Sequence, residues 1–292
     1  MSAPVAPAPV SHPENFPVAS WLCPSRLRPP IAAIYHFART ADDLADEGQA
    51  DAATRLSDLA EYAEELRAAA HGQVAVDSRW PQVFAPLAGQ IRVWALPLAP
   101  LEALLSAFVQ DVHMSEAGQA PADMAALLNY CQRSANPVGR LLLHLYGIQT
   151  VKALVQSDAV CTALQLINFW QDLSVDLPRG RCYLPRSELD ALDIDPRIPP
   201  PELPALLLQP ERRQRSGELL VRLCAQARQT MLAGAPLARQ IPGRAGWELR
   251  AVVQGGLRVL DKIEALGPFA LQHRPRLRRL DVPRIGWRML RM

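Results

Sequence analysis

The feature that most constrains the fold of this chain is a succession of helix-forming segments separated by prolines and glycines. Between residues 28 and 266, Ala, Leu, Arg, Glu and Gln dominate, and alternating β-branched residues are scarce. Pro29 and Pro30 suit the start of a helix, and Gly48 suits its end. The pattern predicts an all-α chain, with helices near residues 28–47, 51–70, 80–94, 98–115, 121–135, 138–147, 149–175, 210–234 and 243–266.

Two proline-containing stretches interrupt this pattern. Asn136-Pro137-Val138-Gly139 falls inside a long apolar helical run, where proline is expected to kink or split the helix. Residues 195–204 contain five prolines and are expected to form an exposed crossing segment. We expect a disordered tail over residues 1–13, one domain over residues 14–270 and a basic tail over residues 271–292.

Composition and charge exclude several classes of protein. The chain has 292 residues, of which 49% are hydrophobic, and its formal net charge of +2 does not suggest a nucleic-acid partner. It contains five cysteines and no Cys-x-x-Cys pair, so neither disulfides nor a zinc site is expected, and a reducing cytoplasm fits. Residues 1–13 lack the features of a signal peptide, and no run of about 18 apolar residues suggests a membrane-spanning helix.

The first candidate site is an acidic face near the end of the segment 28–47. Asp42 and Asp46 are four residues apart and therefore share one side of a helix, with Arg39 one turn earlier. Acids at this end of a helix meet the negative end of the helix dipole, and like charges at this spacing repel. Because a bound cation would reverse both effects, the pattern indicates a metal site.

A second acidic face with the same spacing lies near the end of the segment 149–175. Asn168, Asp172 and Asp176 form one stripe on a helix whose neighbouring residues are mostly apolar. Such oxygen ligands suit Mg²⁺, which takes one or two carboxylates and completes its shell with water and phosphate oxygens. One isolated aspartate pair is usually a solvated helix face, but two pairs in one chain favour a metal site.

Two arginines follow the second acidic face directly. Arg179 and Arg181 flank Gly180, and guanidinium forks match phosphate oxygens. A single Arg-Gly-Arg is usually a surface turn. Beside acid pairs that suit a metal, however, these arginines indicate a site for a diphosphate held by Mg²⁺.

Three ordered stretches of the chain resemble a known family. They are Ala32–Glu47, Tyr130 followed by Val138-Gly139, and Gln165–Pro185. Together they resemble the head-to-head prenyl synthases, which include squalene and phytoene synthases, over roughly residues 12–265. The resemblance implies a single-domain isoprenoid-synthase helical bundle around a central cavity, in which Mg²⁺ bridges both aspartate faces to a diphosphate.

The fine pattern is similar to one branch of that family. The residues that carry this likeness are Glu14–Ser20, Ser134–Gly139 and Asn168–Asp172, and the branch is the hydroxysqualene synthases of bacterial hopanoid pathways. The likeness implies a lyase that converts presqualene diphosphate and water to hydroxysqualene and diphosphate. No nicotinamide cofactor would be needed, because water rather than hydride ends the reaction.

The resemblance also implies roles for single residues. Tyr35, Tyr130 and Tyr183 match family positions and are candidate catalytic residues, as is Asn168. The water that ends the reaction could be oriented by Asn168, by Gln171 or by a tyrosine hydroxyl. The candidate substrate-binding residues are His12, Asn15, Arg39, Gln171, Arg179 and Arg181. The candidate Mg²⁺ ligands are Asp42, Asp46, Asn168, Asp172 and Asp176.

Two positions depart from the family pattern. Many relatives carry serines after the histidine that matches His12, whereas this chain has Pro13-Glu14-Asn15, and many carry arginine at the position of Gln171. Both changes remove groups associated with diphosphate binding. We therefore hypothesise a site tuned for one diphosphate rather than two, an idea that fails if farnesyl diphosphate is consumed as efficiently as presqualene diphosphate.

Three other functions stay open. A transferase of the same family would condense two prenyl diphosphates to presqualene diphosphate, squalene or phytoene. A non-catalytic helical scaffold would carry the acids as surface charge. A metal-dependent phosphohydrolase usually has histidines among its metal ligands, and the two stripes contain none.

The chain ends in an arginine-rich segment. Residues 274–292 contain seven arginines and one acid, Asp281. Either this segment is a solvated tail, or it contacts an anionic membrane through Arg274, Arg276, Arg278, Arg279, Trp287 and Leu290. We expect a cytoplasmic location, peripheral at the inner membrane face in the second case, with pathway enzymes as further candidate partners.

Overall fold

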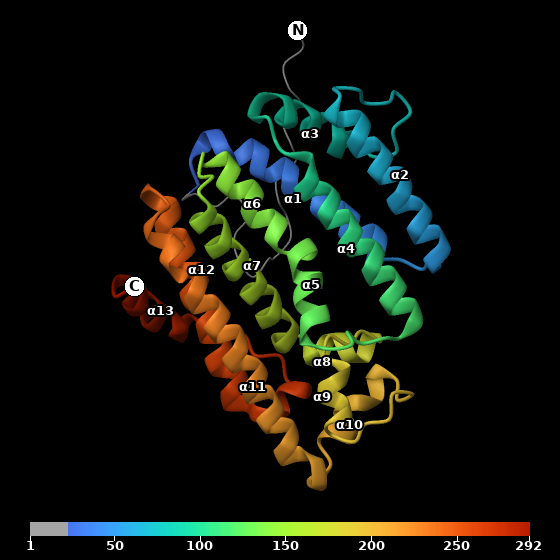
Figure 1. Ribbon diagram of the computed structural model, residues 1–292, viewed down its shortest axis with the longest axis vertical. Helices are drawn as coiled ribbons and strands as arrows, with labels where there is room; N and C mark the ends of the chain where they lie inside the picture. Colours follow the sequence, from blue (N-terminus) through green and yellow to red (C-terminus); the bar gives the residue numbers. More distant parts are fainter. Residues whose placement is uncertain (1–22) are drawn as a thin grey trace. The chain divides into compact units, whose positions relative to one another are not determined.

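The computed structural model describes residues 23–292, and within them the secondary structure is helical with no strand (Figure 1). This confirms the predicted all-α class. The α-helices are α1 Arg28–Asp46, α2 Ala52–Ala70, α3 Pro81–Trp94, α4 Leu98–Ala117, α5 Met124–Ser134, α6 Asn136–Leu145, α7 Val151–Gln171, α8 Leu173–Asp176, α9 Arg186–Asp190, α10 Leu203–Leu207, α11 Pro210–Gly234, α12 Gly243–Leu266 and α13 Val282–Leu290. His12, Asn15 and the predicted tail over residues 1–13 lie outside the described residues.

The structure confirms the predicted effect of proline at Pro137 and confirms it only in part over residues 195–204. Helix α5 ends at Ser134 and α6 begins at Asn136, so the helical run is split as expected beside Pro137. In the segment 195–204, by contrast, Pro200 and Leu203 are buried. They lie three residues apart across a 3₁₀ turn over Pro200–Glu202 and the start of α10, so both fall on one side of that turn. The expectation of an exposed segment is therefore wrong for these two residues.

The described chain forms two compact units. The first unit contains residues 23–113 together with Pro137–Thr150, which is α1 to α3, most of α4, and α6. The second unit contains Met114–Asn136 and Val151–Met292, which holds α5 and α7 to α13. Each unit carries one of the two acidic faces.

An aromatic cluster forms the core of the first unit. The rings of Phe37 and Tyr62 stack with centroids 5.3 Å apart, and the rings of Tyr62 and Phe84 lie 4.7 Å apart. The Tyr62 hydroxyl donates a hydrogen bond to the Phe37 carbonyl oxygen over 3.0 Å. These contacts join α1, α2 and α3, and because Phe37 lies on α1 they fix the helix that ends in Asp42 and Asp46.

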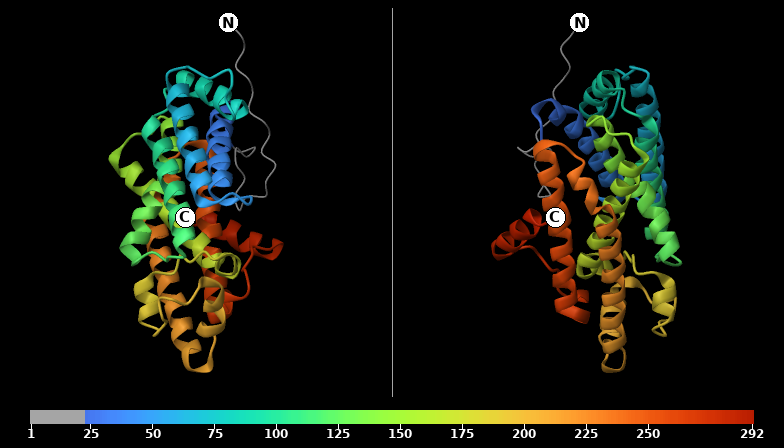
Figure 2. Two further views of the ribbon diagram at one scale, coloured as in Figure 1. Left: turned by 90° about the vertical axis from the view of Figure 1, so that its right-hand side faces the viewer. Right: turned by 60° about the vertical axis from the view of Figure 1, so that its left-hand side comes forward.

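The second unit is built around the buried helix α7. Helices α7, α11 and α12 run side by side (Figure 1 and Figure 2). Gly234 at the end of α11 permits the close approach to α7, because a Cβ atom there would lie 2.5 Å from the Gln156 carbonyl oxygen and 2.7 Å from a Val160 methyl group. Trp170 near the end of α7 is fully buried. The packing therefore holds the turn that carries Asn168 and Asp172.

None of the helices in the described part of the chain combines the length and apolar character that a bilayer crossing requires.

Candidate functional site

The acidic face of the first unit occupies the last two turns of α1. The Arg39 guanidinium lies 3.0 Å from the Asp42 carboxylate, 2.5 Å from that of Asp43 and 2.9 Å from that of Glu47. Burial opposes the charge of Arg39, but these carboxylates outweigh it and raise the pKa of Arg39 above its ordinary value. Three carboxylates thus contact one guanidinium, and Asp46, the last residue of the helix, adds a fourth acid at the negative end of the helix dipole. The face therefore has a net negative charge that a cation can neutralise.

Tyr35 lies on the same helix, one turn before Arg39. Its side chain is half-buried, and its ring meets the His36 ring edge to face with centroids 5.6 Å apart. The structure thus places Tyr35, Arg39, Asp42 and Asp46 together on α1, as the spacing predicts.

The acidic face of the second unit lies at a helix break rather than along one helix. The predicted helix over 149–175 ends at Gln171, and Asp172 precedes the short helix α8 with φ −99° and ψ 9°. The Asp172 amide nevertheless donates to the Asn168 carbonyl oxygen over 2.9 Å, and the Asp176 amide donates to the Asp172 carbonyl oxygen over 2.8 Å. Since these bonds keep the four-residue spacing, Asn168, Asp172 and Asp176 stay on one side.

The two carboxylates of this face influence each other strongly. Burial and then the neighbouring charge of Asp172 raise the pKa of Asp176 to about 7, while Arg179 and Arg274 act in the opposite direction. Half of the Asp176 side chains therefore carry a proton near neutral pH. A divalent cation between the acids would favour the ionised form of both.

Arg274, which the sequence suggested as a membrane contact, lies instead against the second acidic face. Its Nε lies 2.5 Å from Asp172 Oδ1, and its Nη2 lies 3.1 Å from Asp172 Oδ2. The two side chains thus form a bidentate pair, in which the Asp172 side chain is only 14% exposed. The Gln171 side-chain amide, which is buried, donates to the Pro275 carbonyl oxygen over 2.7 Å. Gln171 thus holds the backbone next to Arg274 in place. Seven arginines in residues 274–292 were visible in the sequence, but nothing in their spacing marks this one.

The turn after Asp176 brings the two predicted arginines beside the acids. Gly180 has φ 84°, a left-handed conformation that glycine adopts without strain, and the Arg181 amide donates to the Asp176 carbonyl oxygen over 3.0 Å. Arg179 is exposed and Arg181 is half-buried. Both follow the acidic face directly, in the arrangement that suits a phosphate group.

Three aromatic rings meet in the second unit. Phe169 stacks on Tyr183 with centroids 4.0 Å apart, and the Tyr130 ring lies 6.1 Å from Phe169 and 6.2 Å from Tyr183. They come from α5, from α7 and from the loop that follows Arg181. The structure therefore brings together two of the three predicted tyrosines, and both adjoin the turn that carries Asn168.

The donor chemistry of each face fits a hard divalent cation. Within the described residues, no group of three or more His, Cys, Asp or Glu side chains is arranged to hold a metal by itself. A pair of carboxylates with one amide oxygen is nevertheless the kind of partial shell that Mg²⁺ completes with water and phosphate oxygens. Burial and the charge of Asp172 raise the pKa of Asp176 despite Arg179 and Arg274, so a further cation would favour the ionised carboxylate. The residues present thus fit Mg²⁺ bound together with a phosphate-bearing ligand.

Comparison with known proteins gives concordant matches. A model of the squalene/phytoene synthase family matches residues 10–281. A hydroxysqualene synthase of Rhodopseudomonas palustris is 38% identical over 179 residues, which cover 61% of this chain and 57% of that protein. A presqualene diphosphate synthase of the same organism is 28% identical over 206 residues, which cover 68% and 70%.

A solved structure with a similar fold is that of squalene synthase HpnC from Alicyclobacillus acidocaldarius. It superposes with a TM-score of 0.73 at 30% identity, over 86% of this chain and 88% of that chain. The chain spans less than two thirds of the length of the curated hydroxysqualene synthases that it matches, at 57% of each.

Proposed function

Because the chain belongs to the squalene/phytoene synthase family, we propose that it ionises a prenyl diphosphate and that its reaction is that of a hydroxysqualene synthase. Presqualene diphosphate would lose its diphosphate group, the carbocation would rearrange, and water would capture it to give hydroxysqualene. The observation that carries the proposal is the geometry of the second acidic face, where half-buried Asp176, with its pKa raised to about 7, lies beside Asp172 and is followed by two arginines. Such a face is built to bind a cation and a phosphate group together.

Five residues would hold Mg²⁺ in this proposal: Asp42, Asp46, Asn168, Asp172 and Asp176. The ion would neutralise charge on the departing diphosphate, which stabilises the transition state electrostatically. Arg274 holds the Asp172 carboxylate by its bidentate pair and so orients that carboxylate for this task.

The arginines and the polar residues of the N-terminal stretch would bind the substrate. Arg179 and Arg181 follow Asp176 directly, and Arg39 lies against Asp42 at 3.0 Å. Guanidinium groups at these places can bind phosphate oxygens as forks. We propose the same role for His12 and Asn15. For Gln171 the proposal is narrower, since its amide donates to Pro275, so that it would act on the diphosphate through the segment carrying Arg274.

The aromatic rings would protect the carbocation. The ring centroids of Tyr130, Phe169 and Tyr183 lie 4.0 to 6.2 Å apart. Aromatic faces exclude water and stabilise cations. Tyr35 would act from α1 in the same way. Asn168, on the same side as Asp172, would orient the water that ends the reaction.

Two further aspects of the proposal concern organisation and location. Residues 14–270 would form the catalytic domain, with Arg274 reaching it from the basic segment 271–292. We place the protein in the cytoplasm, in peripheral contact with the inner membrane face, where the hydrophobic product and other pathway enzymes would meet it.

The second candidate is a transferase that condenses two prenyl diphosphates. The similarity to a presqualene diphosphate synthase supports it, but the identity of 28% is lower than the 38% to a hydroxysqualene synthase. The glutamine at position 171, in place of arginine, also favours a site for a single diphosphate.

The deciding experiment is incubation of the full chain with Mg²⁺ and either presqualene diphosphate or farnesyl diphosphate, without NADPH, followed by identification of the C30 product. We expect hydroxysqualene from presqualene diphosphate and little consumption of farnesyl diphosphate. Presqualene diphosphate formed from farnesyl diphosphate would instead establish the transferase. If neither prenyl diphosphate is turned over, the result would favour the non-catalytic helical scaffold, in which the aspartates are surface charge.

A further inference from the structure

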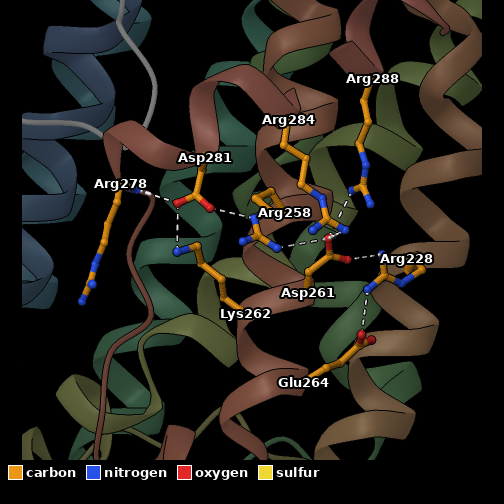
Figure 3. Close-up of polar contacts among 9 residues, drawn as sticks. All are labelled: Arg228, Arg258, Asp261, Lys262, Glu264, Arg278, Asp281, Arg284 and Arg288. Carbon is orange, nitrogen blue, oxygen red and sulfur yellow. Dashed lines mark hydrogen bonds and ion pairs between the residues drawn. The ribbon is translucent and has the colours of Figure 1, made fainter. Parts of the chain in front are cut away.

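The last helix, α13, docks on the second unit through its charged side. Arg284 and Arg288 are four residues apart and therefore share one face, and both point to Asp261 of α12, at 3.7 Å and 3.2 Å (Figure 3). Asp261 is only 17% exposed and also pairs with Arg228 of α11 at 3.2 Å. The inner side of α13 therefore carries Arg288 together with the half-buried Ile285 and Met289, while Arg284 reaches Asp261 from a side chain that is 55% exposed.

The segment before α13 is fixed in the same manner. Asp281, with a side chain 5% exposed, accepts from Arg258 Nε over 2.7 Å and from the Arg278 backbone amide over 2.7 Å, and pairs with Lys262 Nζ at 2.8 Å (Figure 3). At the other end, Arg239 donates to the carbonyl oxygen of Met292 over 3.0 Å. Polar contacts hold α13 at its start, along its length and at its end.

Three large apolar side chains of α13 point outward, although Ile285 and Met289 are half-buried. No residue of this helix is buried, and the exposed fractions are 63% for Val282, 57% for Trp287 and 68% for Leu290, with Leu280 just before the helix at 90%. A surface helix of a globular protein normally has the opposite orientation, with apolar residues inward and charges outward. Figures 1 and 2 show this dark-red helix on the outer side of α12.

Positive charge surrounds the outward apolar face. Arg276, Arg278 and Arg279 are exposed immediately before the helix, and Arg291 stacks on the Trp287 ring at 4.2 Å. Exposed leucine and tryptophan beside several arginines suit the headgroup region of a bilayer that contains anionic lipid. A protein partner with an acidic apolar groove would fit the charge, but not the position of Trp287, whose ring is amphipathic and favours a membrane interface.

We propose that α13 is a membrane-docking helix, anchored to the second unit by ion pairs and inserting Val282, Trp287 and Leu290 among anionic phospholipids. This inference rests on the membrane contact that is part of the proposed function and deepens it by assigning the surface and the lipid class. It does not depend on which reaction the acidic faces perform.

The test is co-sedimentation of the full chain with vesicles of phosphatidylethanolamine and phosphatidylglycerol, compared with phosphatidylcholine vesicles. We expect binding to the anionic vesicles only, weakened by salt. Trp287→Glu and Leu290→Glu should each reduce the partition coefficient about tenfold or more. The matched control is Leu232→Glu, which places the same charge at an exposed leucine (52%) of α11 in the same unit and should bind as the unchanged chain does.

Three results would contradict a membrane-docking role for α13. The first is binding of Leu290→Glu to anionic vesicles as strong as that of the unchanged chain, and the second is equal binding of the unchanged chain to both vesicle types. The third is a dimer of the unchanged chain that Leu290→Glu converts to a monomer, with no vesicle binding by either protein. Circular dichroism of each variant checks that α13 and the fold persist. Turnover of presqualene diphosphate in detergent is measured in parallel. If the unchanged chain turns over presqualene diphosphate but does not bind anionic vesicles, the docking helix alone is contradicted; if it binds these vesicles but has no turnover, the proposed reaction alone is contradicted.

Discussion

Asp176 shows at the scale of one residue how a proposed metal ligand opposes stability. Its pKa is raised to about 7 by burial and by the charge of Asp172, so the folded state holds the proton more tightly than the unfolded state. For an acid shifted in this direction, the contribution to stability is most favourable below the ordinary pKa of about 4 and is lost as the pH rises through 7. The ionised pair is therefore destabilising at neutral pH until a cation binds.

A substitution at Asp176 tests this directly. In EDTA at pH 8, Asp176→Asn should raise the melting temperature by about 2–5 °C, because it removes a half-buried charge, and the increase should become smaller at pH 5 and vanish below about pH 4. Mg²⁺ should stabilise the unchanged chain at pH 8 and the variant less. Asp190→Asn, at a carboxylate 57% exposed, is the control and should have no such pH dependence. A lower melting temperature for Asp176→Asn at pH 8 would show that this carboxylate is stabilising without a cation.

Asp281 is the opposite case, a buried carboxylate whose partners stabilise its charge. Burial alone would raise its pKa, but Lys262, the Arg278 amide and Arg258 together hold the pKa well below its usual range. The stability from this group is therefore present above about pH 4 and is lost as the pH falls from there towards the lowered pKa.

We expect Asp281→Asn to lower the melting temperature by about 5 °C at pH 7, since it leaves two cations facing an amide, and to have a smaller effect at pH 3. The control is Asp195→Asn, whose partner Arg197 is 88% exposed, so its loss should leave the melting temperature at pH 7 nearly unchanged. Differential scanning fluorimetry across this pH range measures both. Equal shifts for the two variants would contradict a structural role for the Asp281 cluster.

At the scale of the elements, the contact between α7 and α11 sets the position of the second acidic face. A methyl group at Gly234 would meet the Gln156 backbone and Val160 well inside van der Waals distance. Gly234→Ala should therefore destabilise the fold by about 1–3 kcal/mol, as overpacking does. Gly286→Ala on α13, with open space around it, should be neutral or slightly stabilising. Urea denaturation of both variants measures the difference, and an unchanged midpoint for Gly234→Ala would mean that the two helices can separate freely.

The sequence predicts these elements well where local rules decide them. Alternating helix formers and prolines predict α1 to α7, α11 and α12 to within a few residues, and the acids at i and i+4 predict both faces. The break at Asp172 was not predictable, because no proline or glycine lies near it. The pairing of Arg274 with Asp172 was not predictable either, because the two residues are 102 positions apart in the sequence. Residues 274–292 contain six other arginines, and no local pattern distinguishes Arg274 from them.

The orientation of α13 escaped the sequence for a related reason. An amphipathic helix read from sequence is expected to bury its apolar side. Here the ion pairs of Arg284 and Arg288 with Asp261 decide the orientation, and they join residues more than 20 positions apart. The orientation of α13 thus depends on long-range ion pairs, which the periodicity of the sequence does not predict.

At the scale of the whole molecule, the two acidic faces belong to different units. Asp42 and Asp46 end α1 in the first unit, and Asp172 and Asp176 adjoin the break after α7 in the second. The proposed function requires both faces to act on one diphosphate through Mg²⁺. Residues that act as one catalytic group have strongly non-additive effects when they are removed.

Turnover of presqualene diphosphate by Asp42→Asn, by Asp172→Asn and by the double variant is therefore the most direct test. Each single substitution should reduce kcat by on the order of 10³-fold at saturating Mg²⁺, and the double variant should be little worse than either. Circular dichroism should show folded protein in all three, and Asp190→Asn should keep full turnover. Losses that multiply in the double variant, or full turnover after either single substitution, would contradict a single diphosphate site shared by the two faces.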